Sequence, residues 1–171
     1  MMKAKLLIAG TLVMAMFGTT QAVAANSGVA AFEQLKSLVG HWQAEKPNAN
    51  QSTLDLQLTS GGTAIIEKAE MVEQGKTVEM ITLYYLDGEQ LKLTHYCMAG
   101  NQPTMAATYD PGTKTMKFDF VSATNLKNPN DGHMHNAVYS FVDNDHFKTT
   151  WTFQKDQKAA FTEELTYVRV K

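Results

Sequence analysis

Alternating apolar and polar positions dominate the chain from residue 40 onward, and this pattern predicts strands. The expected strands span residues 40–45, 52–58, 63–72, 77–86, 89–98, 103–109, 114–121, 133–142, 146–154 and 161–170. Turn signals separate most of them, among them Gly61-Gly62, Asp87-Gly88 and Asp110-Pro111-Gly112. About ten consecutive strands with tight connections predict an all-β, antiparallel, up-and-down barrel, because closure removes the edges of a sheet too long to lie flat.

A helical spacing precedes the strands. At three- and four-residue steps before residue 40 stand the apolar residues Phe32, Leu35, Leu38 and Val39. Such spacing places apolar side chains on one face of a helix. We expect a short amphipathic helix over residues 29–39, ended by Gly40, that caps the barrel.

Residues 1–25 show the three parts of an export signal: a basic start at Lys3 and Lys5, the apolar run Leu6 to Phe17, and small residues at Ala22-Val23-Ala24. The run of about a dozen residues is shorter than the roughly 20 that span a bilayer as a helix. No cysteine stands near the cleavage site, so a lipid anchor has no attachment point. We expect cleavage near Ala24, one domain over residues 26–171, and a periplasmic or secreted protein without a membrane anchor.

Charge narrows the range of partners. The chain has 15 basic and 17 acidic side chains, and removal of the leader takes two lysines away. A mildly acidic surface disfavours nucleic acid and anionic membranes as partners. Because a barrel of this size holds one small molecule inside, we expect a small apolar or amphipathic ligand. The sequence carries no signal for an oligomeric state.

His95 and Cys97 stand two residues apart in a strand whose alternate positions Leu91 and Leu93 are apolar. Residues at this spacing share a face of a strand, so both side chains are predicted to point inward. Cys97 is the only cysteine of the chain and therefore forms no internal disulfide. Three roles stay open for its thiol: a buried inert group, a metal ligand, or a nucleophile that works with a histidine.

The turn at Asp87-Gly88 decides which residue lies opposite His95. A three-residue loop with Gly88 in the left-handed position pairs Leu83 with Leu91 and groups the apolar side chains, whereas a two-residue loop at the same place does not. We therefore predict the first register. It places Glu79 opposite His95, as a carboxylate that orients the ring or raises its basicity.

His133 and His135 repeat the spacing of two residues. Side chains at this spacing lie about 6 to 7 Å apart, within reach of one shared ion. Together with His95 and Cys97 they would supply three nitrogens and one sulfur, a set suited to zinc or copper. The alternative is a cysteine in the core and histidines at the barrel rim.

Two sets of motifs resemble known protein groups. Gly40-His41-Trp42 after a short helix, with Arg169 on the last strand, resembles the signature of the calycin superfamily, which includes lipocalins, fatty-acid-binding proteins and nitrobindin-like haem barrels. This resemblance implies that Trp42 packs under Arg169 and closes the barrel base. The stretches His95 to Pro103 and Asp131 to His135 also resemble a group of small exported bacterial proteins without an established activity.

This resemblance does not identify a haem ligand among the residues of this sequence. Nitrobindin-like barrels hold haem through a histidine late in the chain, and the expected last strand, residues 161–170, contains none. If haem binds, the axial ligand has to be His95, His133 or His135. Haem, zinc and copper all stay open as cofactors.

The favoured interpretation is an exported barrel that holds an apolar or amphipathic ligand, haem included. Phe118 and Phe120 share a strand face and would give the ligand an aromatic wall. The expected pocket wall consists of Glu79, His95, Cys97, Phe118, Phe120, His133, His135 and Tyr139. One alternative is an enzyme, metal-dependent or based on histidine and cysteine, in which His95 is the general base and Glu79 orients it. The other is a filled structural barrel with a role in envelope interactions.

Overall fold

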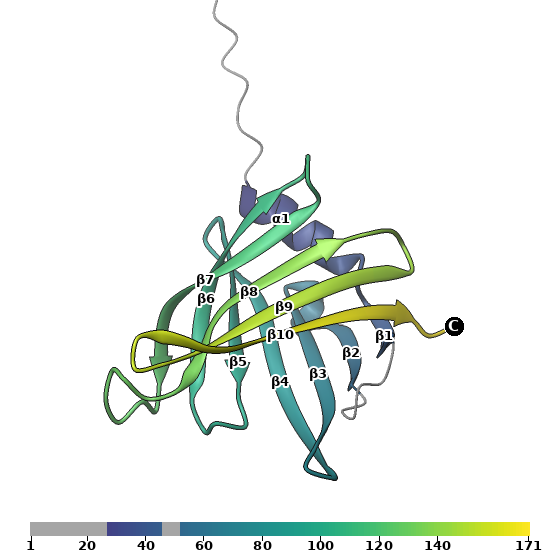
Figure 1. The fold of residues 1–171 in the computed structure, drawn as a ribbon. Coiled ribbons are helices and arrows are strands. Elements are labelled where there is room, and N and C mark those ends of the chain that lie inside the picture. The colour runs from purple at the N-terminus through teal and green to yellow at the C-terminus, as the bar shows by residue number, and fades with distance from the viewer. Residues whose placement is uncertain (1–26, 46–51) are drawn as a thin grey trace, which may run out of the picture.

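Ten antiparallel strands close into a barrel in this computed structural model, which describes residues 27–45 and 52–171 (Figure 1). The predicted leader and its cleavage site lie outside these residues. The strands are β1 (Gly40–Ala44), β2 (Ser52–Thr59), β3 (Ala64–Glu73), β4 (Lys76–Asp87), β5 (Gln90–Tyr96), β6 (Gln102–Asp110), β7 (Thr115–Thr124), β8 (His133–Phe141), β9 (His146–Lys155) and β10 (Lys158–Arg169). A 3₁₀ turn, η1 (Ser60–Gly62), joins β2 to β3. Each strand pairs with its neighbour in sequence, and β1 pairs with β10, so the predicted all-β barrel is confirmed.

Alternation along each strand divides the side chains between the barrel interior and the outer surface. On β3, Ile65, Glu67, Ala69 and Met71 are buried, while the residues between them are more exposed. A strand turns successive side chains to opposite faces, so such a pattern builds a continuous interior. The inward face of β3 therefore carries one buried carboxylate, Glu67, between apolar side chains.

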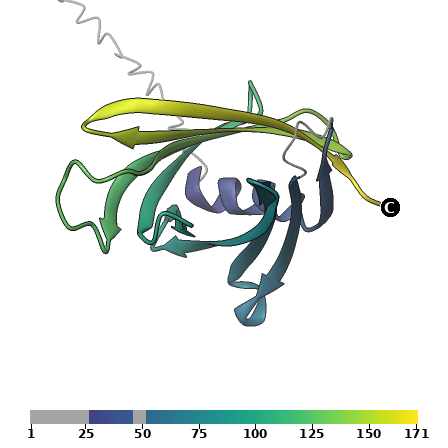
Figure 2. The same cartoon turned by 60° about the horizontal axis from the view of Figure 1, so that its bottom comes forward.

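The helix α1 (Ser27–Lys36) lies against β4, β5 and β6 and covers one end of the barrel interior (Figure 2). Its apolar face buries Phe32 and Leu35. Gly28 makes this docking possible, because a Cβ at this position would lie 1.8 Å from the carbonyl oxygen of Glu89. The helix begins two residues before the predicted start and ends three residues before the predicted end. None of the helices in residues 27–45 and 52–171 is both long and apolar enough to cross a membrane.

Trp42 and Arg169 meet at the closed end, beside the helix. The Arg169 guanidinium lies 4.1 Å from the centroid of the Trp42 ring, and the two residues are paired across β1 and β10. Arg169 also donates hydrogen bonds to the carbonyl oxygens of Ser37 at 2.7 Å and Val39 at 2.9 Å. After Lys36 the backbone continues in turns with hydrogen bonds from i to i−3, such as Leu38 N–H to the Leu35 carbonyl, so the regular helix ends early. Gly40 is required here because an added Cβ would lie 2.8 Å from the guanidinium.

The register between β4 and β5 differs from the prediction. The turn is a two-residue loop at Gly88-Glu89, which pairs Asp87 with Gln90, and Gly88 has a φ of 60°, as the first position of a type II′ turn requires. His95 therefore lies opposite Thr82. The predicted pairing with Glu79 is wrong, because Glu79 pairs with Glu70 and is exposed on the outer surface. Both faces of β4 are apolar, so hydrophobic grouping could not select the register.

Candidate ligand-binding site

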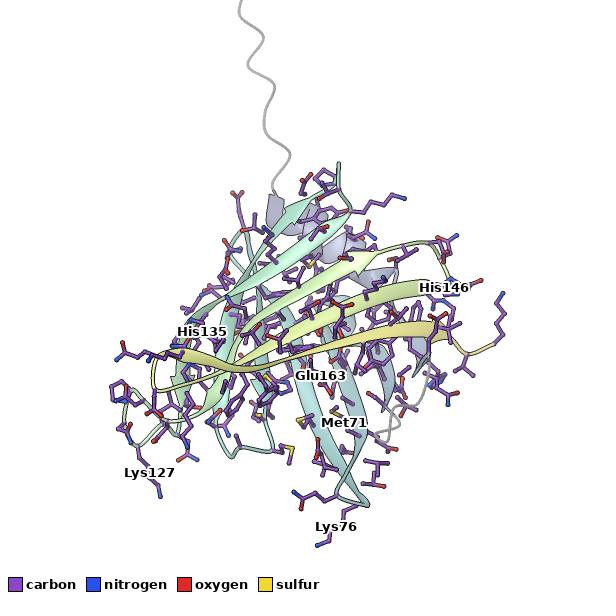
Figure 3. All side chains as sticks on the ribbon, in the orientation of Figure 1. Met71, Lys76, Lys127, His135, His146 and Glu163 are labelled. Atoms are coloured by element: carbon purple, nitrogen blue, oxygen red, sulfur yellow. The ribbon has the colours of Figure 1, made fainter. Side chains whose placement is uncertain are left out.

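Two adjacent cavities lie in the half of the barrel away from α1. The inner cavity has a volume of about 40 Å³ and the mouth cavity about 350 Å³. Met71, Met80, Met134 and Glu163 line both of them, so the two cavities meet at these side chains. Figure 3 shows Met71 and Glu163 on this side of the barrel, with Lys76 of the β3–β4 hairpin beyond them.

The volumes define what each cavity admits. A buried water needs roughly 10–15 Å³, so the inner cavity has room for a few waters or one ion and for no larger molecule. The mouth cavity is at the lower end of the range of about 300–1,000 Å³ for small-molecule sites. Its wall is largely apolar and includes Phe153 and Phe161, whose rings stack with centroids 5.0 Å apart. A small amphipathic molecule fits this arrangement.

Glu67 is the acidic centre of the inner cavity. It is 4 % exposed, and burial raises its pKa from 4.5 to about 7. Tyr84 Oη donates a hydrogen bond to Glu67 Oε2 at 2.9 Å, and the Thr82 hydroxyl also hydrogen bonds to this carboxylate. These donors favour the ionised form and partly offset the desolvation cost.

Two further rings continue the network from Glu67. The hydroxyl groups of Tyr84 and Tyr139 lie 2.6 Å apart. Tyr84 donates its proton to Glu67, the Tyr139 hydroxyl also hydrogen bonds to this carboxylate, and Tyr139 accepts a hydrogen bond from Trp151. Burial raises the pKa of both tyrosines well above the ordinary value, so both remain protonated. The hydrogen bonds of both tyrosines thus meet at the carboxylate of Glu67.

His95 ends the network on its other side. Thr82 Oγ1 lies 2.9 Å from His95 Nδ1. When Thr82 donates to the ionised Glu67, its oxygen accepts the Nδ1 proton, and this leaves a bare lone pair on Nε2. In the described part of the chain, His95 Nε2 is buried without a hydrogen-bond partner. The His95 ring lines the inner cavity, and its centroid lies 5.0 Å from that of the Trp151 ring. Burial lowers the pKa of His95 to about 4, so the ring is neutral near pH 7.

The eight predicted pocket residues do not share one wall. His95 and Tyr139 line the inner cavity, and Cys97 lines the mouth cavity. Phe118 is fully buried against Tyr84 and Tyr139, where it fills the core. Burial raises the pKa of the Cys97 thiol, which therefore stays protonated and disfavours a role as nucleophile.

Phe120, His133 and His135 form a separate ring cluster that lines neither cavity. The Phe120 centroid lies 4.7 Å from that of His133 and 4.8 Å from that of His135. His133 Nδ1 donates to the carbonyl oxygen of Asp131 at 2.9 Å, so its Nε2 accepts from His135 Nδ1 at 3.1 Å. The sequence placed these three residues in the pocket wall, and the structure places them beside it.

The four-ligand metal set of His95, Cys97, His133 and His135 is not assembled. Across residues 27–45 and 52–171, no group of three or more His, Cys, Asp and Glu side chains is positioned to hold a metal ion. The two predicted pairs face different surroundings, because His133 and His135 bond to each other while His95 faces the inner cavity. Haem does not fit at His95 either, since a cavity of about 40 Å³ has no room for a macrocycle.

Sequence reasoning missed Glu67, Thr82 and Trp151. A signal for Glu67 was present, because it stands at an alternate position between Ile65 and Ala69 on an otherwise apolar face. Thr82 depended on the β4–β5 register, and Trp151 depended on which segment crosses the barrel from His95. Neither residue could be recognised as part of the site from its neighbours in the sequence.

The comparisons with known proteins identify the fold. No described protein family matches the sequence, and neither does any curated protein. The solved structure of Rv2717c from M. tuberculosis is 12% identical over 82% of this chain and 98% of that chain, with a TM-score of 0.56. A protein of unknown function from the DUF3598 family of Nostoc punctiforme is 13% identical over 80% of this chain, with a TM-score of 0.51, and the match spans 49% of that longer chain. These similarities support the barrel fold, and the finer resemblance to calycins stays a prediction.

Proposed function

We propose that this protein binds a small amphipathic molecule, with its apolar part in the mouth cavity and a hydrogen-bond donor directed at His95. The observation that carries the proposal is the buried, unpartnered Nε2 of His95 at the base of an apolar opening. A buried polar atom without a partner costs free energy, and a ligand that supplies one recovers it. Such a ligand gains orientation as well as affinity, because a neutral ring that donates its Nδ1 proton to Thr82 accepts a hydrogen bond at Nε2.

The acidic residues around the cavities limit which head groups the ligand can have. Glu67 and Glu163 line the inner cavity, and Glu73 lines the mouth cavity. Burial and the charge of Glu73 both raise the pKa of Glu163, which indicates an acidic neighbourhood. A carboxylate ligand would be repelled by these groups. An alcohol or an amine is compatible with them and donates the required hydrogen bond.

Three ligands with one chain length test the proposal: 1-octanol, octylamine and octanoate. Trp151 contacts His95, so binding is followed by tryptophan fluorescence and by calorimetry. We expect 1-octanol and octylamine to bind and octanoate to bind at least about tenfold more weakly, the ratio that 1.4 kcal/mol produces. Equal binding of all three, or no binding of any, would contradict the proposal.

Matched histidine variants assign the head-group contact. His95→Phe keeps a ring against Trp151 and removes the acceptor, so the alcohol should lose at least about tenfold in affinity. His135→Phe is the control, because His135 lines neither cavity. Equal losses in the two variants would show that the head group does not reach His95. Circular dichroism and thermal unfolding establish that both variants are folded.

The hydrogen-bonded network around His95 favours one second candidate, an enzyme in which His95 Nε2 removes a proton from a bound substrate or water. Thr82 and Glu67 then orient the ring, in the role that the sequence assigned to Glu79. Hydrolysis of 4-nitrophenyl octanoate tests this candidate. An enzyme should lose turnover by orders of magnitude in His95→Gln while it still binds the substrate, whereas a carrier shows no turnover to lose.

A further inference from the structure

Sulfur atoms gather where the two cavities meet. Met71, Met80 and Met134 line both cavities and are 8 %, 8 % and 9 % exposed. Cys97 and Met98 line the mouth cavity just outside them. The stick view shows sulfur atoms in this region, near the labelled Met71 (Figure 3). Thioethers from three strands thus surround the place where the two cavities meet.

The strand register explains how these side chains come together. Met80 on β4 pairs with Ala69, so Met71 is its diagonal neighbour on β3. Thr82 pairs with His95, so His95 is the diagonal neighbour of Met80 on β5. Diagonal neighbours lie about 7–8 Å apart and are within reach of long side chains. Met134 approaches the same cavity from β8.

His95 supplies the second, independent observation. Its Nε2 is buried, has no partner among the described residues, and belongs to a ring that lines the inner cavity together with all three methionines. The hydrogen bond between Thr82 and Nδ1 leaves Nε2 as the free nitrogen, the arrangement that orients a metal-binding imidazole. One nitrogen and three thioether sulfurs therefore surround a space that has room for an ion.

We propose that Met71, Met80, Met134 and His95 form a binding site for copper(I). Thioether and imidazole ligands are soft or intermediate and select copper(I) over zinc, magnesium or calcium. All four ligands are neutral, and the Glu163 carboxylate that lines the same cavity compensates the charge of the cation. A cavity of about 40 Å³ suits a bare ion held by protein ligands alone. This site goes beyond the proposed organic ligand and does not require it, but both use His95 Nε2, so copper(I) and the head group of that ligand are alternative occupants of this atom.

Two buried methionines elsewhere in the barrel provide matched controls. Met105 and Met116 are 0 % exposed and line neither cavity. They fill the core, the usual role of buried methionine. If the cavity methionines were core filling as well, both groups would respond to metal in the same way.

The experiment combines a titration with a resolved signal from each methionine. Purified protein with ¹³C-labelled methionine methyl groups is titrated with silver(I), a redox-inert substitute for copper(I), and then with copper(I) without oxygen in competition with bathocuproine disulfonate. We expect one equivalent to bind and to shift the methyl signals of Met71, Met80 and Met134, while those of Met105 and Met116 stay in place. Zinc should shift none of them.

Conservative variants complete the test. Met→Leu at 71, 80 or 134 retains the side-chain volume and removes the sulfur. Each variant should weaken copper(I) binding at least about tenfold. Loss of a residue that only hydrogen bonds to a metal ligand already weakens metal binding by that factor. Met105→Leu and Met116→Leu should bind as the parent does. Absence of binding in competition, shifts in all five methyl signals, or binding abolished by Cys97→Ser but retained in the Met→Leu variants would each overturn the proposal. Binding of 1-octanol is measured in metal-free samples of the same variants, so failure of the metal site and failure of the organic site are distinguishable.

Discussion

Glu67 and His95 respond to folding in opposite ways, although they belong to one hydrogen-bonded network. Folding raises the pKa of Glu67 from 4.5 to about 7, so its contribution to stability is complete below pH 4.5 and is lost as the pH rises to 7. Folding lowers the pKa of His95 from 6.5 to about 4, so its contribution is complete above pH 6.5 and is lost as the pH falls to 4. Where the two pH ranges overlap, the changes that Glu67 and His95 make to the free energy of unfolding have opposite signs and cancel in the parent protein.

Single substitutions should separate the two titrations. Relative to the parent, Glu67→Gln should gain free energy of unfolding as the pH rises from 4.5 to 7, and His95→Gln should lose it as the pH rises from 4 to 6.5. Each change approaches about 3 kcal/mol, because one pKa unit corresponds to about 1.4 kcal/mol. Urea unfolding at several pH values measures both slopes, and slopes of equal sign would show that the two groups do not titrate in this way.

Glu67 and His95 show which features of the site can be predicted from the sequence and which cannot. Alternation correctly placed His95 and Cys97 in the interior, because the apolar residues Leu91 and Leu93 fix that face. The partner of His95 could not be predicted in the same way, because it depends on how a neighbouring strand is aligned. Glu67 was predictable in principle from its apolar neighbours.

At the scale of elements, β4 shows why the alignment was predicted wrongly. Ile81, Leu83 and Tyr85 form an apolar outer row, and Met80, Thr82 and Tyr84 form the inner row. An apolar outer row has the same sequence pattern as a row that faces the core, so the hydrophobic pattern supported the wrong β4–β5 register. The turn residue decided the register instead, because Gly88 begins a two-residue turn.

A pair of leucine substitutions tests this assignment. Leu91 is 0 % exposed in the interior, and Leu83 is half-buried on the outer row. Leu91→Ala should lower the free energy of unfolding by about 2–5 kcal/mol, and Leu83→Ala by about 1 kcal/mol or less. Denaturant unfolding compares them directly. A larger effect at Leu83 would favour the rejected register.

At the scale of the whole molecule, the sequence predicted the architecture well and the site poorly. Ten strands, their order and the closing helix follow from local periodicity and turn residues, which each segment carries by itself. The site combines side chains from β2, β3, β4, β5, β8, β9 and β10, which only barrel closure brings together. His133 and His135 line neither cavity, and a β-bulge between Met134 and Asn136, which local alternation does not predict, shifts the register at that end of β8.

Arg169 holds the closed end, and its replacement should affect stability without affecting the cavities. It is the only arginine of the chain, and it binds three backbone carbonyls, those of Ser37, Val39 and Asn144. Arg169→Lys loses the fork of donors and should lower the free energy of unfolding by about 1–3 kcal/mol. Thermal unfolding measures the loss, with Lys148→Arg as an exposed control. A change in 1-octanol affinity would indicate that the two ends of the barrel are coupled.

The pairing of β1 with β10 has a consequence for how the chain acquires its structure during synthesis. The ring joins the first strand to be made to the last one, at Trp42 and Arg169 among other positions. A growing chain that lacks β10 leaves β1 and β9 with open edges, which pair readily with other chains. The ring can therefore be completed only after β10 has left the ribosome. Until then, any chain that lacks β10 must be kept apart from its neighbours.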